Sequence, residues 1–271
     1  MIEFFNEVRA VATRRNVYVD LSKVTVLTPD AIATLLATIH HCRIGGAQIS
    51  GNVPLNVEAE QMLNDSGFRT YVRNSPTFQY VTPKGHIEKR TISGETFQNK
   101  FDQYLAERLI EFATSKLSGT RQPHRPSFSV FCEAMLNTFN HAAKSEHLHE
   151  PWWASVYFDS TRQRACFTFI DQGVGIFRSH RFTRRLNLLR SLYMLNPGEI
   201  LKLLFHGEIP STTRLPGRGN GIPGMCDHCK AGRIKQFMVI TNRAIGNAET
   251  DTYGVLSHEF AGTLLYWEIE S

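Results

Sequence analysis

The sequence contains no long hydrophobic run and no sign of a signal peptide. Nowhere in its 271 residues do about eighteen apolar residues follow one another, so we expect no membrane-spanning helix and no membrane partner. The first ten residues, MIEFFNEVRA, carry acidic side chains where a signal peptide would carry basic ones. These absences predict a cytoplasmic protein.

Cysteine is scarce, and the count is odd. Without an export signal, the five cysteines favour reduced thiols over a disulfide framework. Cys226 and Cys229 have the CxxC spacing of a zinc half-site, but no second ligand pair is evident. We expect them to be ordinary helix residues, with metal binding as the alternative.

The net charge of +5 comes from one segment. Residues 177–218 contain eight basic side chains, Arg178, Arg181, Arg184, Arg185, Arg190, Lys202, Arg214 and Arg218, against only Glu199 and Glu208. Such a segment could neutralise a polyphosphate ligand or a nucleic-acid backbone.

A predicted helix from Phe128 to Ala143 carries the most distinctive pattern. Glu133, Asn137 and His141 are four residues apart and form one polar stripe on an otherwise apolar helix. The stripe faces either solvent or a bound ligand, and the helix alone does not decide between them.

The N-terminal part reads as a βαβα unit. Strands are expected over residues 17–21 and 47–51, a helix after Thr28-Pro29-Asp30, and another helix over residues 57–63. Residues 10–75 resemble part of a STAS domain, the fold of anti-sigma-factor antagonists, which implies docking of a partner protein.

The phosphate-acceptor serine of those domains has no counterpart here, because the matching positions read Thr28, Pro29, Asp30 and Ala31. Asp30 is explained as an acid in the first helical turn, where it suits the helix dipole. The alternative is a permanently charged mimic of phosphoserine.

Residues 74–99 are polar and interrupted by proline and glycine, which predicts a connector with a hairpin near Pro83 to Gly85. Further on, we expect a helix over residues 97–117, a strand hairpin over 153–171, and two final strands over 233–243 and 260–270. Asn196 followed by Pro197 predicts a helix start.

Four motifs stand in order along residues 97–271. They are the polar stripe, the turn Asp171-x-Gly-x-Gly after a strand, a glycine-rich loop before a helix, and Gly262-Thr263 in the last strand. Together they resemble the GHKL ATPase superfamily, whose members share the Bergerat nucleotide-binding fold. The stripe is most similar to that of anti-sigma-factor kinases, whereas histidine kinases have asparagine where Glu133 stands.

The resemblance implies a role for each matched residue. Glu133 would be the general base, and Asn137 would hold Mg²⁺ through its amide oxygen, a hard ligand suited to that ion. Asp171 would accept the adenine amino group, with Thr263 helping through a water molecule. The other nucleotide contacts are expected from His141, Gly173, Gly175, Ile176, Gly217, Arg218, Gly219, Asn220, Gly221, Ile222 and Gly262. ATP and Mg²⁺ are therefore the expected cofactors.

The expected fold class is α/β: a STAS-like module over residues 1–75, a connector over 76–96, and a Bergerat-type sandwich over 97–271 whose mixed sheet has helices on one face. Residues 177–216 would form a long lid over the phosphates. The expected activity is slow ATP hydrolysis or phosphate transfer to a partner protein bound at the STAS-like module or the lid. The alternative is a nucleotide-gated interaction switch without significant turnover. A homodimer is compatible with this reading, and nucleic acid is not the expected partner.

Overall fold

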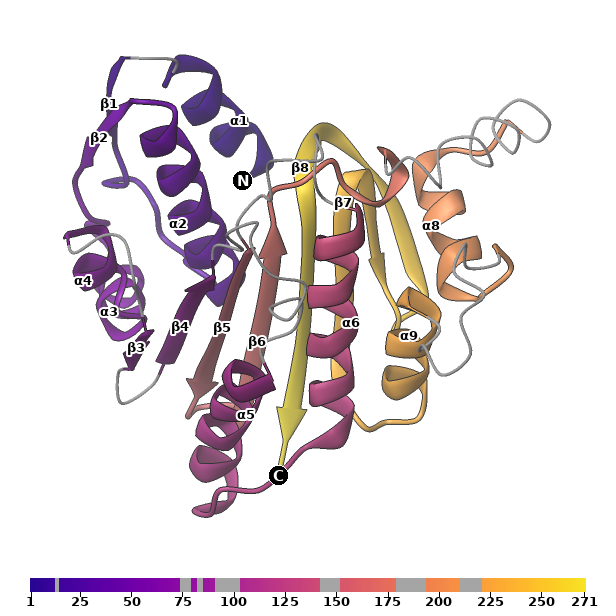
Figure 1. Ribbon diagram of the computed structural model, residues 1–271. Coiled ribbons are helices and arrows are strands. Elements are labelled where there is room, and N and C mark those ends of the chain that lie inside the picture. Colours follow the sequence, from indigo (N-terminus) through magenta and orange to yellow (C-terminus); the bar gives the residue numbers. More distant parts are fainter. Residues whose placement is uncertain are drawn as a thin grey trace.

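The computed structural model describes residues 1–12, 15–73, 79–81, 85–90, 103–141, 152–178, 194–209 and 221–271 (Figure 1). The helices are α1 Ile2–Val11, α2 Pro29–Ile44, α3 Val57–Asp65, α4 Phe68–Arg73, α5 Gln103–Ser118, α6 Arg125–His141, the 3₁₀ turn η2 Ile176–Arg178, α8 Pro197–Phe205 and α9 Ile222–Lys230. The strands are β1 Asn16–Val19, β2 Gln48–Gly51, β3 Gln79–Val81, β4 Gly85–Arg90, β5 Trp152–Asp159, β6 Arg164–Asp171, β7 Lys235–Asn247 and β8 Thr252–Glu270. No helix among these residues is long and apolar enough to cross a membrane.

Local sequence signals account for several helix ends. Asn196 caps α8 by accepting the Glu199 backbone N–H, and the Glu199 carboxylate accepts the Asn196 backbone N–H in return. This reciprocal pair satisfies two N–H groups that the first turn would leave unpaired. Pro29 is the first residue of α2, a position that favours proline, and it directly follows Thr28. The helix starts expected from these residues are confirmed.

Six strands form the main sheet, in the order β3-β4-β5-β6-β8-β7, and every neighbouring pair is antiparallel. The expectation of an α/β protein is confirmed, but a mixed sheet is wrong for the described strands. The physical reason is connectivity: β3–β4, β5–β6 and β7–β8 follow each other directly along the chain, and short connections produce antiparallel pairs. The parallel pair β1–β2 forms a separate small sheet whose strands are joined through α2.

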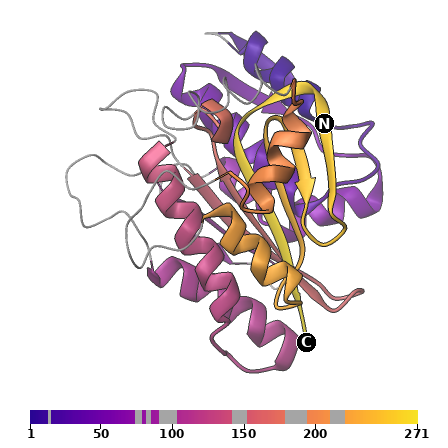
Figure 2. The ribbon, with the colours of Figure 1, turned by 90° about the vertical axis from the view of Figure 1, so that its right-hand side faces the viewer.

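Helices cover both faces of the main sheet, so the expectation of helices on one face is incomplete. One face packs against α5, α6, α8 and α9 in a core that includes Phe131, Phe167 and Trp267. The other face packs against α1 and α2 through Trp153 and Ile170, among others. Figure 2 shows the strands lying between the N-terminal helices and helices α5 and α6. The N-terminal segment therefore forms the second helical layer, on the other face of the sheet.

Two segments, expected from the sequence to be a connector and a lid, contribute strands or a helix to this sandwich. The hairpin expected near Pro83 to Gly85 is present as β3 and β4, and β4 pairs with β5 at the end of the main sheet. Within residues 177–216, Ile200, Leu201 and Phe205 of α8 are buried in the core. Residues 194–209 thus belong to the packed body.

Candidate functional site

Asp171 ends β6 in a buried turn. The residue is only 7% exposed, and its side-chain Oδ1 accepts the Gly173 backbone N–H at 2.9 Å. Across the sheet, Asp171 is the register partner of Thr263 on β8, which in turn is the register partner of Thr241 on β7. The carboxylate is therefore fixed in orientation at the point where three strands meet.

The chain after Asp171 is held by two side chains of β7. Thr241 Oγ1 accepts the Ile176 N–H at 2.9 Å, and Asn242 Oδ1 accepts the Phe177 N–H at 3.0 Å. Asn242 Nδ2 also donates to the Val174 carbonyl at 3.0 Å. These three bonds pair three backbone groups of the turn with three side-chain atoms of β7 and so tie the turn to the sheet.

Glycine is required at two places beside this turn. Gly175 has φ +76°, and a Cβ there would lie 2.6 Å from Asn242 Oδ1. Gly262 has φ +98°, and a Cβ there would collide with the carbonyl of Asp171. Since both positions exclude a side chain, the backbone of the turn and of β8 can come close together.

Thr241 and Asn242 were not among the residues expected from the sequence. Their signal is the polar interruption Thr241-Asn242-Arg243 inside the strand MVITNRAI, with Asn242 at φ +50° beside a shift in the β7–β8 register. A polar pair in a buried strand predicts either a bulge or a site, and here it forms a bulge that holds the Asp171 turn.

Gln172 is a second unexpected residue. It is 3% exposed, and neither its amide nitrogen nor its amide oxygen has a hydrogen-bond partner among the described residues. An unpaired buried polar group costs about 1–3 kcal/mol. The turn that carries Asp171 therefore includes a polar residue that works against its stability.

Glu133 and Asn137 lie one helical turn apart on α6, and both are partly buried. The opposite side of α6 is fully buried through Phe131 and Met135, and Val130, next to the stripe, is also fully buried. Burial, together with the neighbouring Glu133 charge, raises the pKa of Cys132 to about 12. This thiol stays protonated near neutral pH and is no nucleophile.

The start of α6 is anchored to the far end of β8. Ser127 Oγ accepts the indole N–H of Trp267 at 3.0 Å, and it pairs with His124 Nδ1 at 2.9 Å. Ser127 is fully buried, so this Ser–His pair is a structural link and no exposed nucleophile.

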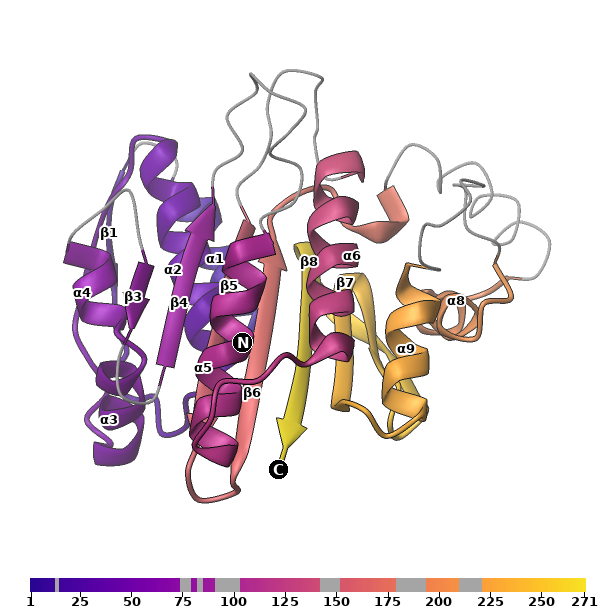
Figure 3. The ribbon, with the colours of Figure 1, turned by 60° about the horizontal axis from the view of Figure 1, so that its bottom comes forward.

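This anchor fixes how far along β8 the polar stripe of α6 lies. From Ser127 to Asn137 the helix rises about 15 Å, and from Trp267 back to Thr263 the strand spans about 14 Å. Asn137 therefore lies at the level of Thr263 and of its register partner Asp171. Figures 1 and 3 agree, since the C-terminal end of α6 and the C-terminal end of β6 point toward the same end of the sheet.

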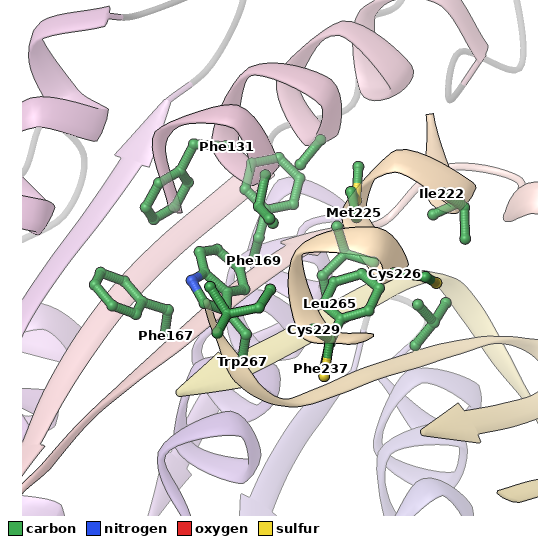
Figure 4. Close-up of a cluster of buried hydrophobic side chains, with 14 of the residues drawn as sticks. Phe131, Phe167, Phe169, Ile222, Met225, Cys226, Cys229, Phe237, Leu265 and Trp267 are labelled. Atoms are coloured by element: carbon green, nitrogen blue, oxygen red, sulfur yellow. The ribbon is translucent and has the colours of Figure 1, made fainter. Parts of the chain in front are cut away.

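The core beneath these elements is continuous. Figure 4 shows side chains of α6, β6, β8 and α9, including Phe131, Phe169, Leu265 and Met225, converging on one cluster. Ile222, expected as a nucleotide contact, is buried in this cluster. Gly221 directly precedes it with φ +60° and opens α9.

Cys226 and Cys229 lie in the same cluster, and burial raises the pKa of both thiols above the ordinary range. No group of three metal-ligating side chains occurs in the part of the chain that the structure describes. The two cysteines are core residues of α9.

Several expected contacts cannot be placed. Gly217, Arg218, Gly219 and Asn220 lie outside the described residues, as do most of the basic segment's arginines, and the side chain of His141 is not described. Arg178 is described, and its Nη2 pairs with Glu259 Oε2 on β8 at 2.8 Å. This arginine faces a carboxylate of the sheet.

No protein-family model and no curated protein sequence matches this chain. A functional assignment must therefore come from the residues of the site.

Proposed function

We propose that the chain binds ATP with Mg²⁺ at the end of the sandwich where α6, β6 and α9 meet, in a Bergerat-type arrangement. The main support is the common level of Asn137, Asp171 and Thr263, residues from three distant parts of the chain. Gly175 and Gly262 add to it, because without side chains they let the Asp171 turn pack closely against β7 and β8, which holds Asp171 in place.

The available side chains suit this ligand. Asp171 is a buried acceptor held in one orientation, which fits the exocyclic amino group of adenine. Asn137 offers an amide oxygen, a hard ligand of the kind Mg²⁺ accepts alongside water and phosphate oxygens. When bound, the ion would neutralise charge on the phosphates.

Glu133 would act as the general base in this proposal. Its carboxylate lies one turn from Asn137, so it would face the terminal phosphate when Asn137 faces the ion. There it would accept the proton of an attacking water or of a protein hydroxyl. The proposed reaction is slow ATP hydrolysis or phosphate transfer to a partner protein.

Binding is tested by titrating ATP with Mg²⁺ into the protein in a calorimeter. Asp171→Asn keeps an oxygen for the Gly173 N–H but replaces the other carboxylate oxygen with an NH₂ donor, which cannot accept from the adenine amino group, and we expect an affinity about 10- to 100-fold lower. Asp159→Asn is the matched control, because Asp159 lies at the opposite end of the β5–β6 hairpin. Equal affinity of wild type and Asp171→Asn would refute the adenine assignment.

Turnover is tested with γ-labelled ATP. We expect Glu133→Gln to retain ATP affinity within a factor of about three while release of labelled phosphate, or labelling of a protein band, falls by about 100-fold or more. Wild type that releases no phosphate and labels no protein, despite binding ATP, would reject the enzyme and favour the alternative below.

The alternative is a nucleotide-gated interaction switch, and one observation favours it. Ile170, next to Asp171, and Leu264, next to Thr263, both lie in the core shared with α1 and α2. Nucleotide binding at one face of the strands would therefore reach the N-terminal layer through adjacent residues. A switch needs only that ATP favour one of two states, and it predicts that Glu133→Gln leaves partner binding unchanged.

A further inference from the structure

A cavity of about 400 Å³, open to solvent on one side, lies in the N-terminal layer between β1, β2, α2 and α4. Its walls are mainly aliphatic and aromatic, with Val19, Leu35, Ile39, Ile49, Phe68 and Val72 among the lining residues. Protein interiors are otherwise close-packed, with few voids larger than a water molecule. The volume falls in the range of pockets that hold small-molecule ligands.

The cavity is separate from the proposed nucleotide site. Leu35 and Ile39, four residues apart on α2, face the cavity. His40, on another side of the same helix, contacts Trp153 of the main sheet with ring centroids 5.6 Å apart. Helix α2 thus divides the cavity from the sheet, and a ligand could enter without touching the strands that carry Asp171 and Thr263.

One charged side chain lines the cavity. Arg69 of α4 donates from Nη2 to Glu60 Oε1 at 2.8 Å, and its side chain is 41% exposed. A guanidinium group has five N–H donors, so this one pair leaves most of them available. The polar residue Asn52 also lines the cavity, but its amide already bonds to the Leu21 N–H and to Asp20.

We propose that this cavity binds an amphiphile with an apolar body and a carboxylate head. The apolar walls would take the body, and Arg69 at the exposed side would pair with the carboxylate in competition with Glu60. A guanidinium binds a carboxylate through two parallel N–H donors, which favours this head group over an uncharged one. The proposal does not depend on the nucleotide site.

Decanoate, below the concentration at which it forms micelles, is a suitable probe, with the uncharged decanamide as its comparison. Calorimetry without nucleotide should show one decanoate bound per chain. We expect decanamide to bind about tenfold more weakly, the effect of losing one hydrogen bond between charged groups. Absence of decanoate binding to the wild-type chain would overturn the proposal.

Two valine substitutions locate the probe. Val53→Phe adds bulk at the cavity wall, and we expect it to reduce decanoate affinity by at least about tenfold. Val26→Phe adds the same bulk at a residue 75% exposed and should leave the affinity unchanged. If Val53→Phe binds decanoate as well as Val26→Phe does, the ligand lies elsewhere and the proposal fails.

A second pair tests the head group and does not depend on filling the cavity. Arg69→Met should remove the preference for decanoate over decanamide while keeping binding of the apolar body. Glu60→Gln frees Arg69 from its ion pair and should strengthen decanoate binding by a few-fold. An unchanged preference in Arg69→Met would overturn the assigned role of Arg69 and with it the carboxylate class.

Discussion

The two faces of the main sheet are packed by different chemistry. On the face toward α6, the Trp267 ring stacks on Phe167 with centroids 5.1 Å apart and meets Phe131 edge-on at 4.8 Å. On the face toward α2, the neighbouring positions are polar: Thr168 is fully buried without a hydrogen-bond partner among the described residues. The adjacent β6 residues Phe167 and Thr168 therefore lie on opposite faces of the sheet, Phe167 in an aromatic layer and Thr168 in a partly polar one.

The difference extends to charge. Glu268, next to Trp267, is 2% exposed, and it accepts from Arg164 at 2.8 Å and from the Tyr266 hydroxyl at 2.5 Å. Burial is the main cause that raises the pKa of Cys166 to about 11 beside this group. The comparison teaches that the face toward α6 is packed by stacked aromatic rings, while the other face also carries buried polar groups whose pairing is uneven.

The largest effect should come from the aromatic face. Trp267→Ala removes two ring contacts and leaves Ser127 without its donor, and we expect a loss of about 3–5 kcal/mol in the free energy of unfolding. The control is Tyr104→Ala on α5, 74% exposed, which should cost no more than about 0.5 kcal/mol. Urea unfolding measures both, and similar losses would contradict the comparison.

The second-largest effect is expected at Gly262 in β8, a strand with side chains on both faces of the sheet. Gly262→Ala should cost more than about 2 kcal/mol, because the added Cβ meets the Asp171 carbonyl and φ is positive. Gly119→Ala measures the cost of a positive φ alone, since Gly119 has φ +75° with open space around it. We expect this substitution to cost about 1 kcal/mol. The two unfolding midpoints in urea give the difference, and equal costs would mean that β8 can move away from Asp171.

A matched pair of threonines sharpens the contrast in polar pairing. Both Thr241 and Thr168 are fully buried, but in the part of the chain that the structure describes only Thr241 bonds, to the Ile176 N–H and to the Gly262 carbonyl. We expect Thr241→Val to cost about 1–3 kcal/mol and Thr168→Val to be neutral or slightly stabilising. Thermal unfolding with calorimetry measures both. A large cost for Thr168→Val would reveal a bonded partner such as buried water.

The smallest effect concerns pH. Burial lowers the pKa of His124 below its ordinary 6.5, and its Nδ1 accepts the Ser127 N–H at 3.2 Å, which requires the neutral ring. Below pH 6.5 the unfolded chain binds a proton that the folded chain resists, so stability falls as pH decreases toward the folded pKa. His124→Gln should reduce this loss in urea unfolding between pH 7 and 5. An unchanged pH slope would contradict it.

Much of the fold could be predicted from local patterns. The capping signal at Asn196, the β5–β6 hairpin and the two C-terminal strands are confirmed, because caps, alternation and turns depend on residues close in the chain. The motif residues Asn137, Asp171 and Thr263 could also be named, and their joint role remains a prediction. Thr241, Asn242 and Gln172 were missed, since their roles depend on a neighbouring strand or a turn.

The sequence alone determined where most of the helices and strands form, since these follow from spacing along one chain, but it did not predict α1 and α4. It did not determine that α1 and α2 cover the second face of the sheet, that α8 belongs to the core, or that a cavity lies behind α2. Those features arise from which apolar surfaces meet. Several surfaces of similar size could have met, and only packing of the whole chain selects among them.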